Sequence, residues 1–128
     1  MSNKYLRQLK TIQTEHNLNR VYAVDSAGPG NVNHVYAIAK NREGREFNDV
    51  IASICFQNGP RNDSNSIDGV LDTDLLEIVR DRLKAFQSSE FTCEYNACAL
   101  RHIEEALYQM KLRVQDRAER KVLGTNET

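Results

Sequence analysis

Basic side chains are concentrated near the C-terminal end of the chain, at a spacing suited to holding an anion. Residues 111–121 include five cations and two carboxylates. The cations are Lys111, Arg113, Arg117, Arg120 and Lys121. Arg113, Arg117 and Arg120 follow i, i+4, i+7 spacing, which places them on one helix face. Because guanidinium groups match phosphate oxygens, this face predicts either an anion clamp or a solvated helix end that complements the helix dipole.

Two further side chains have chemistry that suits a nucleotide. Asn96 falls on one helical stripe with Leu100, Ile103 and Leu107. An amide there is either solvated in a first helical turn or oriented in a pocket, where it can pair with an adenine edge or a ribose hydroxyl. Phe86 ends the apolar stripe of the preceding segment. It is either a core plug between two helices or a stacking platform for a base.

The distance between these residues predicts that more than one chain forms the site. Asn96 and Arg113 are seventeen positions apart, which is roughly 25 Å along a helix. One small ligand cannot reach both within a single chain. If two hairpins pack antiparallel, the tip of one, with Phe86 and Asn96, meets the basic end of the other, with Arg113 and Arg117. We therefore expect a composite site for a nucleotide that carries a pyrophosphate.

No other side chains form a catalytic or metal-ligating pattern. The histidines and cysteines have neither zinc nor triad spacing: His16, His34, His102, Cys55, Cys93 and Cys98. The loop with Gly28 and Gly30 lacks the following helix of a phosphate-binding loop. No nucleophile has a neighbouring base. The sequence thus predicts a binding protein that is not an enzyme and needs no cofactor or metal.

A helical hairpin is expected to position these residues. Its first helix should begin near Asp72 or Thr73, either of which can cap it. Residues 87–90 (QSSE) form a short connection, so the second helix should return antiparallel. That helix runs from about residue 92 to about residue 122 and is stopped by Gly124. The first helix is about half as long, so the far half of the second needs another partner, for which a second copy suffices.

The preceding residues are predicted to form a sheet. Residues 20–25, 35–40 and 48–56 are β-rich and closely spaced, which indicates an antiparallel arrangement of about three strands. Residues 5–12 are compatible with a short N-terminal helix. We expect an α+β fold in one domain, 1–128, with a mainly β region (1–56), a loop (57–70) and the helical hairpin (71–124).

Composition excludes several classes of protein. The chain has 128 residues, of which 40% are hydrophobic and 27% charged, as in an ordinary globular domain. The formal net charge of −1 argues against a general nucleic-acid binder. No apolar run approaches the ~20 residues of a membrane span. The N-terminal sequence lacks the apolar centre of a signal peptide, so a cytosolic protein is expected.

Several stretches together resemble one family. They are FQNGP (residues 56–60), GV...LL.IV.DRL..FQ (69–87), FTCEYNACAL (91–100), the closing R...R...GT, and RVYAVDSAGPGNVNHVYAIA (20–39). The chain resembles the Thoeris anti-defence sponges of phages, which share their hairpin domain with the anti-CBASS cyclic-nucleotide sponges. The resemblance covers about 105 residues.

The resemblance implies a function and a set of ligand contacts. Members of this family bind glycocyclic ADP-ribose, the signal that Thoeris TIR enzymes make from NAD, and leave it uncleaved. The contacts carried over are Phe86, Asn96, Arg113 and Arg117, with Arg61 in the loop after NGP. The loop GPRNDSNSIDGV is slightly longer here than the related GPI.E.GVNGV. The preferred isomer therefore does not follow from the resemblance.

The resemblance also implies partners and a location. Family members form dimers that assemble into trimers of dimers, and some bind cyclic di- or trinucleotides at separate sites. The expected location is the cytoplasm of the infected bacterial host. Two other classes remain as alternatives: an enzyme that degrades the signal, and a nucleic-acid or protein-interaction module that uses the basic end of the second helix.

Overall fold

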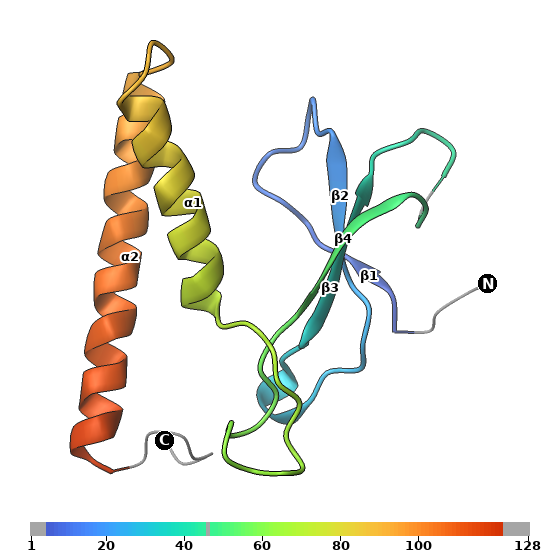
Figure 1. Ribbon diagram of the computed structural model, residues 1–128. Helices are drawn as coiled ribbons and strands as arrows, with labels where there is room; N and C mark the ends of the chain where they lie inside the picture. The colour runs from blue at the N-terminus through green and yellow to red at the C-terminus, as the bar shows by residue number, and fades with distance from the viewer. Residues whose placement is uncertain (1–4, 46, 122–128) are drawn as a thin grey trace. The chain divides into compact units, whose positions relative to one another are not determined.

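The computed structural model describes residues 5–45 and 47–121. The chain divides into two compact units, Met1–Asn58 and Gly59–Thr128. Strands make up the first unit and two helices dominate the second (Figure 1). The α+β class expected from the sequence is therefore confirmed, with the β region preceding the helical hairpin.

In the part of the first unit that the structure describes, four strands form an antiparallel meander in the order β1-β2-β3-β4. The strands are β1 (Arg7–Gln8), β2 (Asn19–Ala23), β3 (Val35–Lys40) and β4 (Val50–Cys55). The register aligns Tyr22 with Ala37 and Ala37 with Ser53. An irregularity between Ile38 and Ala39 shifts the pairing of β3 with β4. Each strand thus pairs with its neighbour in sequence, as short connections favour.

Small residues form most of the core of the sheet. The buried hydrophobic side chains among the described residues are Tyr22, Ala23, Ala37 and Ala39. The Tyr22 ring packs edge-on against Phe47, with ring centroids 5.0 Å apart. Such an arrangement suits aromatic quadrupoles. The sheet therefore relies on close backbone packing around alanines and on a single large buried ring.

The loop between β2 and β3 is organised by one carboxylate. Asp25 accepts hydrogen bonds from the backbone N–H groups of His34 (3.0 Å) and Val35 (3.2 Å) and from the side-chain amide of Asn33 (3.1 Å). Burial raises the pKa of Asp25, but these hydrogen bonds lower it by more, so the pKa lies below its ordinary value of 3.8. The ionised Asp25 carboxylate, which follows the end of β2, is therefore hydrogen-bonded to the start of β3.

The short helix considered for residues 5–12 is absent, and this expectation was wrong. Arg7 and Gln8 instead pair with Ala23 and Tyr22 as strand β1, and Leu9 N–H donates to the Val21 carbonyl at 2.9 Å. A helix of about two turns does not recover its nucleation cost without packing. The edge of β2 offers backbone partners directly, so the segment adds a fourth strand.

Up to residue 121, where the described part of the second unit ends, this unit contains two antiparallel helices, α1 (Asp72–Gln87) and α2 (Glu94–Glu119) (Figure 1). Neither Asp72 nor Thr73 caps α1, contrary to expectation, because the cap position is Leu71. Leucine has no side-chain acceptor, but the Asp74 carboxylate accepts the Leu71 N–H at 2.8 Å. This is one half of a capping box. No helix among the described residues is long and apolar enough to span a membrane.

Helix α2 ends slightly earlier than the sequence predicted. Its C-cap is Arg120, and Lys121 follows with φ of +60°. A residue in this left-handed conformation terminates a helix by turning the chain back onto the last carbonyl groups. The Lys121 N–H accordingly donates to the Ala118 carbonyl at 3.1 Å. Gly124, the expected stop, lies outside the described residues.

Candidate ligand-binding site on the helical hairpin

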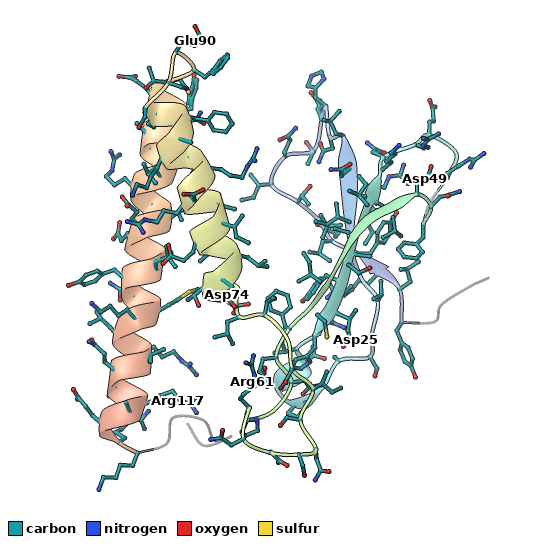
Figure 2. The ribbon with its side chains drawn as sticks, viewed as in Figure 1. Asp25, Asp49, Arg61, Asp74, Glu90 and Arg117 are labelled. Carbon is teal, nitrogen blue, oxygen red and sulfur yellow. The ribbon has the colours of Figure 1, made fainter. Side chains whose placement is uncertain are left out.

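The tip of the hairpin carries Phe86 and Asn96. Phe86 lies in the last turn of α1, and 37% of its surface is exposed. Asn96 lies in the first turn of α2 and is half-buried. A six-residue connection, which includes Glu90, joins the two helices (Figure 2). The fold therefore places an accessible aromatic ring and an amide at the same end of the hairpin.

Arg82 is a neighbour of Phe86 that the sequence analysis did not single out. Its guanidinium carbon lies 5.7 Å from the centroid of the Phe86 ring, within the range of a cation–π contact. The four-residue spacing of Arg82 and Phe86 on one helix is the signal that identifies such a pair from sequence. A positive charge thus accompanies the aromatic ring within one chain.

The basic face predicted near the end of α2 is divided by local pairing. Arg113 is exposed and Arg117 half-buried. Arg120 Nε pairs with Asp116 Oδ2 at 3.0 Å. Figure 2 shows Arg117 near the end of α2 that lies away from Glu90. The pairing of Arg120 with Asp116 thus reduces the net positive charge of this face.

One continuous helix separates the basic end from the tip. Asn96 and Arg113 both belong to α2, Glu94–Glu119. A rise of 1.5 Å per residue puts them roughly 25 Å apart. A single hairpin consequently does not bring Phe86 and Asn96 together with Arg113 and Arg117.

Arg61 braces the loop that precedes α1. Its Nη2 donates to the Gly69 carbonyl at 2.9 Å, and its Nε lies 3.3 Å from Asp68 Oδ1. The same loop folds closely over Gly59, which has φ of +88° and where a Cβ atom would lie 2.6 Å from Ser66 Oγ. Glycine is required there, and the arginine has a structural role whether or not it contacts a ligand.

A cleft of about 670 Å³ lies between the helices towards the start of α1. Across it, Arg80 of α1 pairs with Glu104 of α2 at 2.9 Å. Arg80 also pairs with Glu77 of its own helix at 3.3 Å. The hydrogen bonds that Arg80 donates to Glu104 and Glu77 raise the pKa of its guanidinium group. Val114 lines the cleft and is 46% exposed. The apolar stripe of α2 thus continues into the open cleft.

Neither helix of the hairpin contains a buried residue. Large apolar side chains are instead exposed, among them Ile78 (59%), Tyr95 (88%) and Tyr108 (62%). Two helices share one seam and leave their other faces open. The hairpin therefore has apolar surface available for another layer.

Among residues 5–45 and 47–121, no group of three or more histidine, cysteine, aspartate or glutamate side chains could hold a metal ion. The three cysteines are free and exposed.

These features define a small α+β protein whose helical hairpin presents an aromatic ring and an amide at one end and arginines at the other. Residues 49–115 match the family described as Acb2/Tad1, hairpin domain, and the chain belongs to this family. The match covers slightly more than half of the chain. The family resemblance inferred from the sequence is thereby confirmed.

A protein of Bacillus phage SBSphiJ7 named Thoeris anti-defense 1 is similar to this chain. The two are 40% identical over 83 residues, which make up 65% of this chain. The matched stretch spans 58% of the length of the phage protein.

Proposed function

We propose that this protein is an anti-defence sponge that binds glycocyclic ADP-ribose without cleaving it and so blocks Thoeris immunity. Membership of the Acb2/Tad1 hairpin family supports a role in anti-defence. So does the similarity to a phage protein named for Thoeris anti-defence. In this proposal the protein acts as a sequestering agent in the cytoplasm of the infected bacterial host.

The observation that carries the proposal is the separation of complementary groups along α2. Phe86 and Asn96 occupy the tip, and Arg113 and Arg117 lie at the other end of α2. Two hairpins packed antiparallel juxtapose these groups in two equivalent sites, as a twofold dimer requires. The ring then stacks on the base, the amide pairs with a base edge or ribose hydroxyl, and the partner's two guanidinium groups bind the pyrophosphate.

The exposed apolar surface of the hairpin supports this dimer. The apolar stripe of α2 extends beyond α1 to Val114, and covering such a stripe is the usual source of stability in helical bundles. Assembly of three dimers into a hexamer is a further part of the proposal, drawn from the family resemblance. Cyclic di- or trinucleotides are proposed as ligands of separate sites, to be tested by competition with glycocyclic ADP-ribose.

The direct test is capture of the signal. The protein is incubated with the products of a TIR enzyme, washed and heated, and the released material is examined by mass spectrometry. We expect intact glycocyclic ADP-ribose from the wild type and from Gln109→Ala, an exposed control on α2. Phe86→Ala and Asn96→Ala should release little.

Three outcomes would count against this function. Retention of the ligand by both Phe86→Ala and Asn96→Ala would show that the pocket lies elsewhere. Cleavage products in the heat-released fraction would indicate an enzyme. Strongly salt-dependent binding to DNA without nucleotide capture would favour an interaction module that uses the basic end of α2.

Mixing two inactive variants tests whether the site is composite. Phe86→Ala lacks the aromatic ring at the tip, and Arg113→Ala/Arg117→Ala lacks the two guanidinium groups at the basic end. After dissociation and reassociation, each mixed dimer contains one intact and one doubly defective site. Random pairing makes half of the dimers mixed, so capture should recover to about a quarter of the wild-type capacity. No recovery, despite mixed dimers visible by native mass spectrometry, contradicts a shared site.

A further inference from the structure

We propose that Gln87 and Cys93 are positioning residues that set the spacing between Phe86 and Asn96. This inference rests on the proposed function, because it concerns the tip of the same ligand site. Gln87 is the last residue of α1, and Cys93 is the cap residue immediately before α2. The two side chains join the helix ends that carry the ring and the amide.

Packing does not hold the connection between the helices. All six residues from 88 to 93 are exposed, including Phe91, of which 66% is accessible. An exposed segment of this kind is ordered by local side-chain to backbone hydrogen bonds rather than by burial. The geometry of the tip therefore depends on which hydrogen bonds the connection makes.

Two hydrogen bonds in series link the residues on either side of the connection. The Gln87 side-chain oxygen accepts the Cys93 N–H at 3.2 Å. The Cys93 thiol then accepts the Asn96 N–H at 3.4 Å as the helix cap. Gln87 directly follows Phe86, so the two hydrogen bonds connect the end of α1 that carries the ring to the backbone of Asn96 at the start of α2.

The hydroxyls of Ser88 and Ser89 donate to α1 only, whereas within the connection the Phe91 N–H donates to Ser89 Oγ at 3.1 Å and the Thr92 N–H to the Ser89 carbonyl at 3.3 Å. Ser88 Oγ donates to the Lys84 carbonyl at 3.0 Å, and Ser89 Oγ donates to the Phe86 carbonyl at 2.8 Å. Both close the C-terminal end of α1 and leave α2 unattached. Ser88 consequently provides a control for general weakening of the connection.

The chemistry of the two residues predicts which replacements preserve the link. A thiol is a weak acceptor, whereas serine is a preferred helix cap. Cys93→Ser should therefore retain the role that Cys93→Ala abolishes. Gln87→Glu keeps the accepting oxygen, and Gln87→Met keeps the length of the side chain without an acceptor.

The first measurement needs no ligand. Amide hydrogen exchange of the full-length protein is followed by NMR in the wild type and the variants. We expect faster exchange at Cys93 in Gln87→Met and at Asn96 in Cys93→Ala. Ser88→Ala, Gln87→Glu and Cys93→Ser should leave both amides protected. Unchanged exchange in Gln87→Met and Cys93→Ala overturns the link itself.

The second measurement is the affinity for glycocyclic ADP-ribose by calorimetry. Preorganised contacts bind more tightly because less ordering is needed. Gln87→Met and Cys93→Ala should therefore bind about fivefold more weakly, the factor that corresponds to the typical loss of one capping hydrogen bond. The conservative variants should restore binding. Affinities of Gln87→Met and Cys93→Ala equal to that of Ser88→Ala overturn the positioning role. A wild type that captures no ligand refutes the proposed function instead, and the exchange data still decide the link.

Discussion

At the scale of single residues, the aromatic ring at the tip is already in contact with a cation. Arg82 lies over Phe86 at 5.7 Å, so the ring is oriented from within its own helix. In the proposed site, a base would stack on a ring that already has one fixed neighbour, and the charge of Arg82 would favour an anionic ligand. The orientation of the Phe86 ring and the position of the Arg82 charge are therefore coupled within α1.

Replacing Arg82 should weaken ligand binding without preventing it. An exposed cation–π contact contributes about 0.5–1 kcal/mol, so Arg82→Ala should bind glycocyclic ADP-ribose about threefold less tightly. The affinity of Arg82→Lys should lie between those of the wild type and Arg82→Ala, because lysine keeps the charge but lacks the planar guanidinium group. Calorimetry at two salt concentrations checks this, with Arg101→Ala, an exposed arginine of α2, as the charge-matched control. Equal losses in both alanine variants would contradict a specific role for Arg82.

At the scale of elements, the sheet depends on an ionised carboxylate in the β2–β3 loop. Asp25 accepts hydrogen bonds from His34 and Val35 at the start of β3. Its pKa is lowered in the folded state. Protonation therefore occurs more easily in the unfolded chain, which links the stability of the first unit to pH.

The sign of this linkage gives a prediction. The contribution of Asp25 is present above its ordinary pKa of 3.8 and is lost as the pH falls through the lower folded value. Asp25→Ala should lower the stability by about 1–2 kcal/mol at neutral pH, because three donors lose an acceptor. Denaturant titrations at several pH values should show that the difference in unfolding free energy between wild type and Asp25→Ala becomes smaller in acid. A difference in unfolding free energy that does not change with pH would contradict a stabilising role for ionised Asp25.

At the scale of the whole molecule, the sequence predicted features that depend on local patterns better than features that depend on long-range contacts. Strand β3 was expected at the residues it occupies, Val35–Lys40, because alternation between two loop signals is a local property. Strand β1 was missed because its pairing with Ala23 and Tyr22 depends on residues distant in sequence. The sequence predicted that Phe86 and Asn96 lie at the same end of the hairpin, because one is near the end of the first helix and the other near the start of the second. The contacts of Arg61 and Arg82 required coordinates, since side-chain geometry decides them.

The open surface of the hairpin gives the last prediction, which concerns assembly. Val114 lies in the cleft where α2 extends past α1 and is 46% exposed. Burying a valine side chain contributes about 2 kcal/mol, and a carboxylate there opposes burial. Val114→Glu should therefore dissociate the proposed dimer and abolish ligand capture, since the arginines of one chain then no longer reach the tip of the other.

The control for this assembly is Gln115→Glu, which introduces the same charge at the next, exposed position. It should remain dimeric, with a Tm that rises with protein concentration as mass action requires. Native mass spectrometry and melting at several dilutions distinguish the two variants. A Val114→Glu protein that is monomeric and still retains glycocyclic ADP-ribose would show that one hairpin suffices. In that case the ligand would contact either Asn96 or Arg113 of one chain, but not both.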